Sequence, residues 1–458
     1  MKIIICGAGQ VGFNIARHLA MENNDVTVID RSPELVRRVN DNLDAQGIVG
    51  HASRPDVLER AGAEDADMII AVTQGDEINM VACQVAHSLF EVPIKIARVR
   101  HQSYLDPAWA NLFSRDHMPI DVIISPEIEV ARAVSRRLKV PGAFEMIPLV
   151  DDKVRLLGVR CDANCPLVDT PLKQLTQLFP DLNLVVVGLL RDNHPLQLSG
   201  NDHMIVGDDV YFVVETSQLQ RAMAAFGHEE PEAKRLLICG GGNIALLLAQ
   251  EIERDFPWIS AKVIEAGADR AAVVASILSG TVVLHGDVLD PEILDEANVS
   301  QTDTVVAVTD DDETNILASL LAKRHGARRA ITLLNKGTYE SLITTLGIDV
   351  IVSPRNITAS TILQHVRRGN IHAVHTLREG FGELIEAEAL DTSNLVGKPL
   401  KEVKLPNRVM IGALVRDGEV ISPRGNTVIQ DKDRVVLFAA AESVRKVEKL
   451  FSVRLEYF

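Results

Sequence analysis

Three glycines near the start of the chain have the spacing of a phosphate-binding turn. They follow the apolar run from Ile3 to Cys6 and precede a helical pattern. In such a turn the first glycine permits a tight bend, and the second lets a pyrophosphate approach the backbone. The third lets the helix pack closely on the sheet, and the N–H groups at the helix start attract phosphate. The candidate binding residues of this turn are Gly7, Gly9, Gln10, Val11 and Gly12.

A carboxylate follows this turn at the spacing expected for a ribose contact. Asp30 ends the apolar run Val26–Ile29. Its two oxygens can accept hydrogen bonds from ribose hydroxyls, and its charge repels a 2′-phosphate. We therefore expect NAD(H), or another adenine nucleotide with a free ribose, rather than NADP(H). The alternative is a degenerate fold in which these residues only pack.

The same signature returns in the second half of the chain. Gly240 and Gly242 follow a second apolar run, Ala245 takes the third position, and Glu265 replaces Asp30. Alanine is tolerated at the third position because only close packing is required there. The segments 71–79 and 124–126 also recur, at 307–315 and 352–354, so we interpret the chain as a tandem duplication. Candidate residues of the second turn are Gly240, Gly242, Asn243, Ile244 and Glu265.

Polar residues follow the fourth predicted strand, where ligands of open α/β sheets bind. We expect Thr73 to face the ligand, Asp76 to cap the next helix, and Asn79 to reach either the ligand or the loop. Thr309 is the second-copy counterpart of Thr73.

Two arginines alternate at the end of the fifth predicted strand. Arg98 and Arg100 should point to one face, and each guanidinium offers a fork for phosphate. The alternative is a salt bridge with Glu127, which is itself a candidate for sensing phosphate charge. The second copy has Leu333 and Asn335 at these places, which predicts a different ligand preference there.

Composition narrows the class of protein. A chain of 458 residues is too long for a single hydrophobic core, so we expect several domains. The net charge of −16 argues against binding of nucleic acid over a broad surface. No apolar run reaches the length of a membrane span, and no signal peptide precedes the first strand. The five cysteines fit a reducing cytoplasm. Cys161 and Cys165 lack a second ligand pair nearby, so we expect two thiols there and no metal site.

Strands and helices alternate at the spacing of a doubly wound, Rossmann-like α/β sheet, and each copy ends in a small α+β module. The segment 228–235 is charged and contains proline, which is typical of a linker. The predicted domains are 1–138 (Rossmann-like), 139–227 (small α+β), 228–235 (linker), 236–366 (Rossmann-like) and 367–458 (small α+β).

No catalytic constellation accompanies the predicted nucleotide sites. The histidines are scattered, and the sequence has no nucleophile elbow, Walker loop or metal cluster. We therefore predict that the chain is not an enzyme. Asp208 with Asp209, and Asp431 with Asp433, could bind an ion, but turn residues before a strand explain them equally well.

The combined motifs resemble the regulator-of-potassium-conductance (RCK/KTN) family, which includes the peripheral NAD-binding subunits of bacterial Trk potassium uptake systems. The resemblance covers nearly the whole chain. It implies a cytoplasmic ring of about four chains on the inner face of the membrane. The ring would bind NAD(H) and ATP or ADP and gate a potassium-translocating subunit of the TrkH/TrkG type. The resemblance also adds His51, Ala52 and Asp287 to the candidate contacts, and His51 stands where many relatives have aspartate.

Two other functions remain open at this stage. A NAD-dependent oxidoreductase would oxidise NADH with an added metabolite. A free-standing nucleotide sensor acting on another protein would bind nucleotide without a membrane partner.

Overall fold

The computed structural model describes residues 1–22, 24–179, 181–339, 343, 346–366, 370–378, 381–393 and 395–451. These residues form two compact units: Met1–Glu129 with Arg355–Val366, and Val130–Pro354 with the described residues after 366. Each unit is described by itself. The predicted ends of the second small domain, 367 and 458, lie outside the described residues, and the predicted domain boundaries stay predictions.

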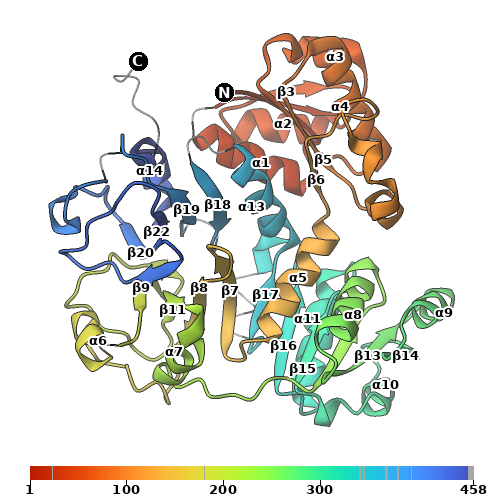
Figure 1. Ribbon diagram of the computed structural model, residues 1–458. Helices are drawn as coiled ribbons and strands as arrows, with labels where there is room; N and C mark the ends of the chain where they lie inside the picture. Colours follow the sequence, from red (N-terminus) through yellow and green to blue (C-terminus); the bar gives the residue numbers. More distant parts are fainter. Residues whose placement is uncertain are drawn as a thin grey trace. The chain divides into compact units, whose positions relative to one another are not determined.

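The first unit contains a six-stranded parallel sheet in the order β3-β2-β1-β4-β5-β6 (Figure 1). Its central strands are buried on both faces, as their continuous apolar runs predict. The strands are β1 (Lys2–Cys6), β2 (Asp25–Asp30), β3 (Gln46–Val49), β4 (Met68–Ala71), β5 (Ile94–Arg98) and β6 (Val122–Ile124). The helices of this first Rossmann copy are α1 (Gln10–Met21), α2 (Pro33–Asn42), α3 (Pro55–Arg60), α4 (Asp76–Phe90) and α5 (Pro126–Leu138), and α5 enters the second unit at Val130.

The second unit repeats this sheet in the order β14-β13-β12-β15-β16-β17. The strands are β12 (Arg235–Cys239), β13 (Ser260–Glu265), β14 (Val282–His285), β15 (Thr304–Ala307), β16 (Arg329–Leu333) and β17 (Val350–Val352). The helices of this second Rossmann copy are α8 (Asn243–Asp255), α9 (Ala268–Ile277), α10 (Pro291–Glu296), α11 (Asp312–Arg324) and α13 (Pro354–Val366), and α13 belongs to the first unit from Arg355 onward. The predicted tandem Rossmann-like fold is confirmed.

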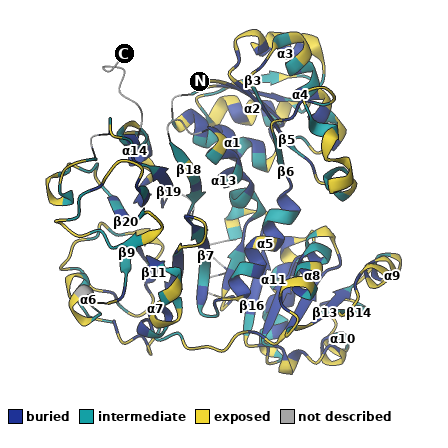
Figure 2. Ribbon diagram, viewed as in Figure 1, coloured by how far each residue is buried: buried dark blue, intermediate teal, exposed yellow. Residues whose placement is uncertain are grey.

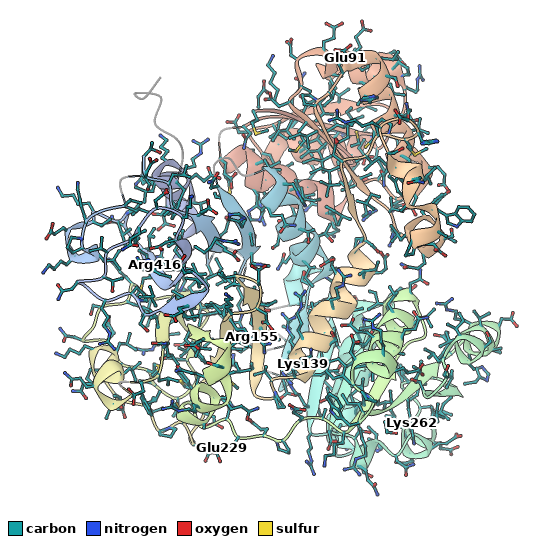
Figure 3. All side chains as sticks on the ribbon, in the orientation of Figure 1. Glu91, Lys139, Arg155, Glu229, Lys262 and Arg416 are labelled. Carbon is teal, nitrogen blue, oxygen red and sulfur yellow. The ribbon has the colours of Figure 1, made fainter. Side chains whose placement is uncertain are left out.

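The last helix of each Rossmann copy packs outside its own copy. Helix α13 follows the second sheet, yet its Ile362 and Leu363 belong to the core beneath β1 of the first sheet. In the second unit, Ser135 near the end of α5 donates to Glu251 of α8 (2.6 Å). Lys139 lies 5.0 Å from the Phe256 ring centroid (Figure 3). The two copies therefore exchange their final helices.

Each Rossmann copy is followed by a five-stranded antiparallel sheet, in the orders β10-β9-β11-β8-β7 and β18-β19-β22-β20-β21. The first has β7 (Ala143–Leu149), β8 (Val154–Arg160), β9 (Leu184–Arg191), β10 (His194–Pro195), β11 (Asp209–Glu215), α6 (Leu172–Leu178) and α7 (Leu219–Ala225). The second has β18 (Ile371–Thr376), β19 (Glu383–Glu388), β20 (Val409–Arg416), β21 (Glu419–Ile421), β22 (Arg434–Ala439) and α14 (Val444–Phe451).

The two small modules share one apolar core. Tyr211 of the first module lies 5.1 Å from Phe381 of the second between ring centroids, and Phe381 lies 4.8 Å from Phe438. Burial of these faces is visible in Figure 2 as dark strands within each sheet. Within the described part of the chain, no helix combines the length and apolar character needed to cross a membrane.

Candidate functional site

The first glycine turn is shaped by close contacts that only glycine permits. Gly7 has a φ of +111°, and a Cβ built on it would lie 3.1 Å from the backbone nitrogen of Thr73. A Cβ on Gly12 would lie 1.8 Å from the carbonyl oxygen of Gly7. A Cβ on Gly9, in contrast, would meet no protein atom within 4 Å. The turn is therefore packed at its first and third glycines and open at the second.

The helix that follows this turn begins without a side-chain cap. Gly9 is the N-cap residue of α1, and no side chain accepts a hydrogen bond from the first turn of the helix. Gln10 and Val11 open the helix, so their N–H groups have no intrahelical partner. Free N–H groups at a helix start attract an anion, and the open side of Gly9 lies at the same place.

Asp30 fixes the turn against the second strand. One carboxylate oxygen accepts the N–H of Ala8 (2.7 Å), and the other accepts the N–H of Ser32 (2.8 Å). A carboxylate has about four acceptor positions, so capacity for ribose hydroxyls is left. Asp30 thus has a structural role in addition to the predicted ribose contact.

The second copy repeats this geometry. Gly240 has a φ of +102°, and Gly242 is again uncapped, with no protein atom within 4 Å of a built Cβ. Ala245 is fully buried at the third position. The carboxylate of Glu265 accepts the N–H groups of Gly241 (2.6 Å) and Gly267 (2.7 Å). Glutamate therefore replaces aspartate with the same two backbone partners.

One residue of the second turn was missed by the sequence interpretation. Arg270 of α9 donates to the carbonyl oxygen of Gly241 (2.7 Å) and to the side-chain oxygen of Asn243 (3.1 Å). The first copy has Leu35 at the corresponding helix position. Its position five residues after Glu265, near the start of the next helix, could have indicated from the sequence that Arg270 reaches the turn. The second turn thus has an arginine contact at a position where the first copy has a leucine.

Asn79 positions the ends of two strands rather than offering a contact to a ligand. Its side-chain oxygen accepts from the backbone nitrogen and hydroxyl of Thr73 (2.8 and 2.7 Å). Its amide donates to the carbonyl oxygens of Thr73 (3.2 Å) and Arg98 (2.9 Å). The side chain is fully buried, so the loop alternative holds, and we remove Asn79 from the candidate contacts. Asn315 makes the same four bonds in the second copy.

The prediction that Asp76 caps helix α4 is wrong. The N-cap residue is Gly75, which provides no side-chain bond. Asp76 instead accepts the N–H groups of Arg100 (2.9 Å) and His101 (2.8 Å), and so holds the chain after β5. Aspartate at a helix start favours either role from sequence alone, and the neighbouring strand decides between them.

Arg98 is a partly buried cation at the carboxyl end of β5. Its Nη2 donates to the carbonyl oxygen of Thr73 (2.7 Å). Burial lowers the pKa of Arg98 to about 10, and the nearby Arg100 adds to this shift. The Nε of Arg98 is buried without a hydrogen-bond partner. A poorly solvated guanidinium with a free donor is stabilised by an added anion.

Arg100 forms the salt bridge that the alternative interpretation described. Its Nε lies 3.0 Å from Oε1 of Glu127, with the arginine side chain 49% exposed and the glutamate 11% exposed. The Oε2 of Glu127 and the Oγ of Ser125 are buried without a partner. Orphaned polar atoms of this kind are costly unless a ligand satisfies them.

The remaining candidates lie at the same strand ends. His51 follows β3 and contacts the hydroxyl of Ser53 (2.9 Å), and Ala52 is buried behind it. Asp287 follows β14, is exposed, and accepts the N–H of Leu289 (2.9 Å). Contact of these residues with a nucleotide stays a prediction.

A tyrosine–glutamate pair near each strand edge was also missed. The hydroxyl of Tyr104 donates to Glu77 (3.4 Å), and that of Tyr339 donates to Glu313 (2.6 Å). Lys336 adds an ion pair with Glu313 (3.0 Å) in the second copy. The glutamates recur in the sequence repeat, which was a signal for this pairing.

One of the candidate ion-binding aspartates in each small module forms a bidentate salt bridge with an arginine. Arg191 bonds both oxygens of Asp208 (2.9 Å each), and Arg416, labelled in Figure 3, bonds both oxygens of Asp433 (2.8 and 2.7 Å). Bidentate pairs of this kind account for these aspartates without a bound ion. Among the described residues, no three His, Cys, Asp or Glu side chains gather as a metal site.

Comparison with known families matches both halves of the chain. Residues 3–126 and 236–354 each match the TrkA-N domain, and residues 156–227 and 384–452 each match the TrkA-C domain. These four segments cover most of the chain, and each falls on one of the four sheets.

Whole-length relatives and solved structures agree with this match. The chain is 54% identical over 458 residues to a Trk system potassium uptake protein TrkA of Azorhizobium caulinodans, with 100% of both chains covered. It is 40% identical over 462 residues to a TrkA of Halomonas elongata, again with 100% of both covered. A structure of the GsuK channel bound to NAD has a TM-score of 0.61 at 18% identity, covering 98% of this chain and 78% of that chain. The GsuK RCK domain has a TM-score of 0.60 at 18% identity, covering 98% and 94%. At these identities the two structures show a shared fold.

Proposed function

The chain belongs to the TrkA family of Trk system potassium uptake proteins, and from this premise we propose that it is the cytoplasmic regulatory subunit of such a system. In this proposal NAD(H) and ATP or ADP bind at the carboxyl edges of the two Rossmann-like sheets. A homotetrameric ring of the chain then gates a membrane potassium transporter.

One observation carries the nucleotide part of the proposal. In each copy an uncapped helix start stands beside an open glycine, next to a carboxylate at the end of the second strand. The free N–H groups suit a pyrophosphate, and Asp30 or Glu265 suits the ribose. The GsuK structure bound to NAD supports this assignment by the shared fold.

The first site also offers a way to distinguish phosphate groups. Arg100 is paired with Glu127, while the Nε of the neighbouring Arg98 is free. A terminal phosphate competes with Glu127 for the guanidinium group of Arg100, next to the unpaired Nε of Arg98. We expect a triphosphate to displace Glu127 from Arg100. A diphosphate, which lacks the third phosphate, should displace it less well.

Helix α5 links this competition to the rest of the chain. Glu127 lies in its first turn within the first unit, whereas Val130–Pro354, which include the rest of the helix, belong to the second unit. Arg329 of β16 donates to the carbonyl oxygens of Arg137 and Ala143 and anchors the end of this helix. A shift of Glu127 is therefore applied to a helix fixed in the other unit. Unequal affinity of ATP and ADP for two ring conformations then gates the partner.

Calorimetric titration of Arg100→Gln with ATP and with ADP tests the proposal. We expect ATP affinity to fall roughly tenfold and ADP affinity to change less, because a charge-assisted bond to the terminal phosphate is lost. Arg254→Gln is the matched control, because Arg254 also pairs with a carboxylate, at 2.8 Å from Asp255, on an exposed helix end. Unchanged ATP affinity in Arg100→Gln would count against the phosphate-sensing role.

The gating part needs a separate readout. Replacing the chromosomal copy with Arg100→Gln should impair growth when potassium is scarce, while Arg254→Gln grows normally. Sustained NADH consumption by the purified chain with an added metabolite would instead support the oxidoreductase alternative.

A further inference from the structure

Two thiols in the first small module lie in contact. Cys161 follows β8, and Cys165 ends the turn after it. Their Sγ atoms are 3.8 Å apart, and the residues are 1% and 5% exposed. The other three cysteines, Cys6, Cys83 and Cys239, are buried in the Rossmann copies.

The backbone holds one thiol firmly and the other in an exposed turn. Cys161 donates its N–H to Asp208 (2.8 Å), and its carbonyl accepts from Gly207 (2.8 Å). Cys165 is held by longer bonds, from its N–H to Asp162 (3.2 Å) and from Val168 to its carbonyl (3.3 Å). Residues 163 and 164 of the turn are exposed. Cys165 is therefore the less firmly held of the two cysteines, and exposed residues precede it in the turn.

The surroundings favour a thiolate at Cys165. The hydrogen bond between the two thiols lowers the pKa of the Cys165 thiol, and the backbone N–H groups of Leu167 and Val168 act in the same direction, whereas burial opposes them. Burial raises the pKa of Cys6 and Cys239 to about 12. The thiolate is the nucleophile in thiol oxidation, so Cys165 differs in reactivity from these cysteines.

The duplicated module shows that the turn does not need these cysteines to fold. Ala389 makes the two backbone bonds that Cys161 makes, to Asp433 and from Lys432 (2.8 and 2.7 Å). Ser393 stands at the place of Cys165, with the matching 3.3 Å bond from Val396. The same turn therefore forms with alanine and serine, so a folding requirement does not explain the thiol pair.

We propose that Cys161 and Cys165 form a peroxide-responsive thiol pair whose oxidised product is an intramolecular disulfide. The Cys165 thiolate attacks one oxygen of hydrogen peroxide, giving a sulfenic acid and, after protonation of the leaving group, water. The Cys161 sulfur then attacks the sulfenic sulfur, forming the S–S bond and releasing a second water. In sum, two thiols lose two electrons and two protons, and one peroxide becomes two waters.

The turn lies against the start of the linker between the two halves. Gly227 has a φ of +85°, and a Cβ there would lie 2.7 Å from the carbonyl oxygen of Asn164. The ring of His228 contacts the carbonyl oxygen of Arg160 (3.1 Å) and the carboxylate of Glu230 (3.0 Å). Closing the sulfur gap to about 2.0 Å moves the turn beside Gly227. Oxidation therefore alters the first residues of the linker.

Mass spectrometry of the full chain tests the pair. The reduced protein is treated with hydrogen peroxide, denatured, alkylated and cleaved with trypsin. Peptide 161–173 contains both cysteines and no other. We expect it to lose about 2 Da and to escape alkylation, and dithiothreitol should reverse both changes. Recovery of this peptide with both thiols alkylated, while peroxide oxidises other sites, would overturn the proposal.

Three variants separate this chemistry from folding. Cys161→Ala and Cys165→Ser copy the second module, so both should fold and lose the 2 Da product, while Cys83→Ser should keep it. Hydrogen exchange of the backbone amides of residues 226–230 and 232–235 should change by about twofold or more between the oxidised and reduced wild type. Equal exchange in the two forms would overturn the link to the linker.

Discussion

Replacing Gly9 by alanine should separate nucleotide binding from folding. A Cβ at this position meets no protein atom within 4 Å, and the backbone angles, φ −65° and ψ −170°, are open to alanine. The added methyl group occupies the space through which a phosphate would approach the uncapped helix start. The substitution therefore removes space for the ligand without disturbing a protein contact.

Two small effects on stability oppose each other in Gly9→Ala. Alanine restricts the unfolded chain, which stabilises by about 0.4–1 kcal/mol, whereas alanine is a poorer N-cap residue than glycine. The net change should stay within about 1 kcal/mol. Loss of one hydrogen bond to a charged phosphate costs roughly 1.5–3 kcal/mol, which weakens binding between about tenfold and a hundredfold.

Calorimetry with NADH and ATP, together with thermal unfolding, measures both quantities. Gly242→Ala is the matched variant, because its Cβ also meets no protein atom within 4 Å. Each variant should silence its own copy and leave the other intact. Gly12→Ala is the contrasting control, since its Cβ would lie 1.8 Å from the Gly7 oxygen and should lower stability as well. Wild-type affinity in Gly9→Ala would refute phosphate binding at this turn.

Other predictions follow from the contacts of single side chains. Asn79→Ala leaves buried backbone groups at two strand ends unpaired and should lower the free energy of unfolding by roughly 2–4 kcal/mol in urea titrations. Asn315→Ala should cost a similar amount, and an insignificant loss in both would contradict the positioning role. In Asp30→Asn the side-chain NH₂ group faces one of the two backbone N–H groups that Asp30 accepts. We therefore expect a loss of about 1–3 kcal/mol in the free energy of unfolding and weaker NADH binding. Neither effect should occur if Asp30 is only a surface carboxylate. Burial, with a smaller contribution from Arg136, lowers the pKa of His375 from 6.5 to about 4, so the unfolded chain binds the extra proton between these values and stability falls as the pH falls. His375→Gln should flatten this slope between urea unfolding at pH 7 and pH 5, and an unchanged slope would exclude His375 as its source.

The sequence predicted the parts of the fold that depend on local pattern. Uninterrupted apolar runs such as Ile3–Cys6 predict strands buried on both faces, and the structure has a strand there, Lys2–Cys6, with Ile3–Cys6 buried. The spacing of the glycines predicted both turns, because only glycine, which lacks a Cβ, allows other atoms to approach the backbone this closely. Because the sequence repeats, the elements predicted for the first half could also be predicted for the second.

Long-range contacts decided what the pattern left open. Asp76 has the sequence context of a cap, but the backbone after β5 lies within its reach and takes both hydrogen bonds. Asn79 could have faced a ligand, and four protein partners instead use all of its capacity. Competition between partners at similar distances cannot be read from residue type.

The exchange of final helices shows the limit most clearly. Apolar residues such as Ile362 and Leu363 favour burial of α13, and the sequence by itself carries that information. It does not specify which of two similar sheets receives these residues, because both present apolar faces of the same kind. Only the tertiary structure places Ile362 and Leu363 beneath the first sheet, since complementary packing between segments far apart in the chain selects one of the two. The amino-acid sequence thus determined two nucleotide-type sheets with their turns and carboxylates, and three-dimensional packing decided how the two copies are joined.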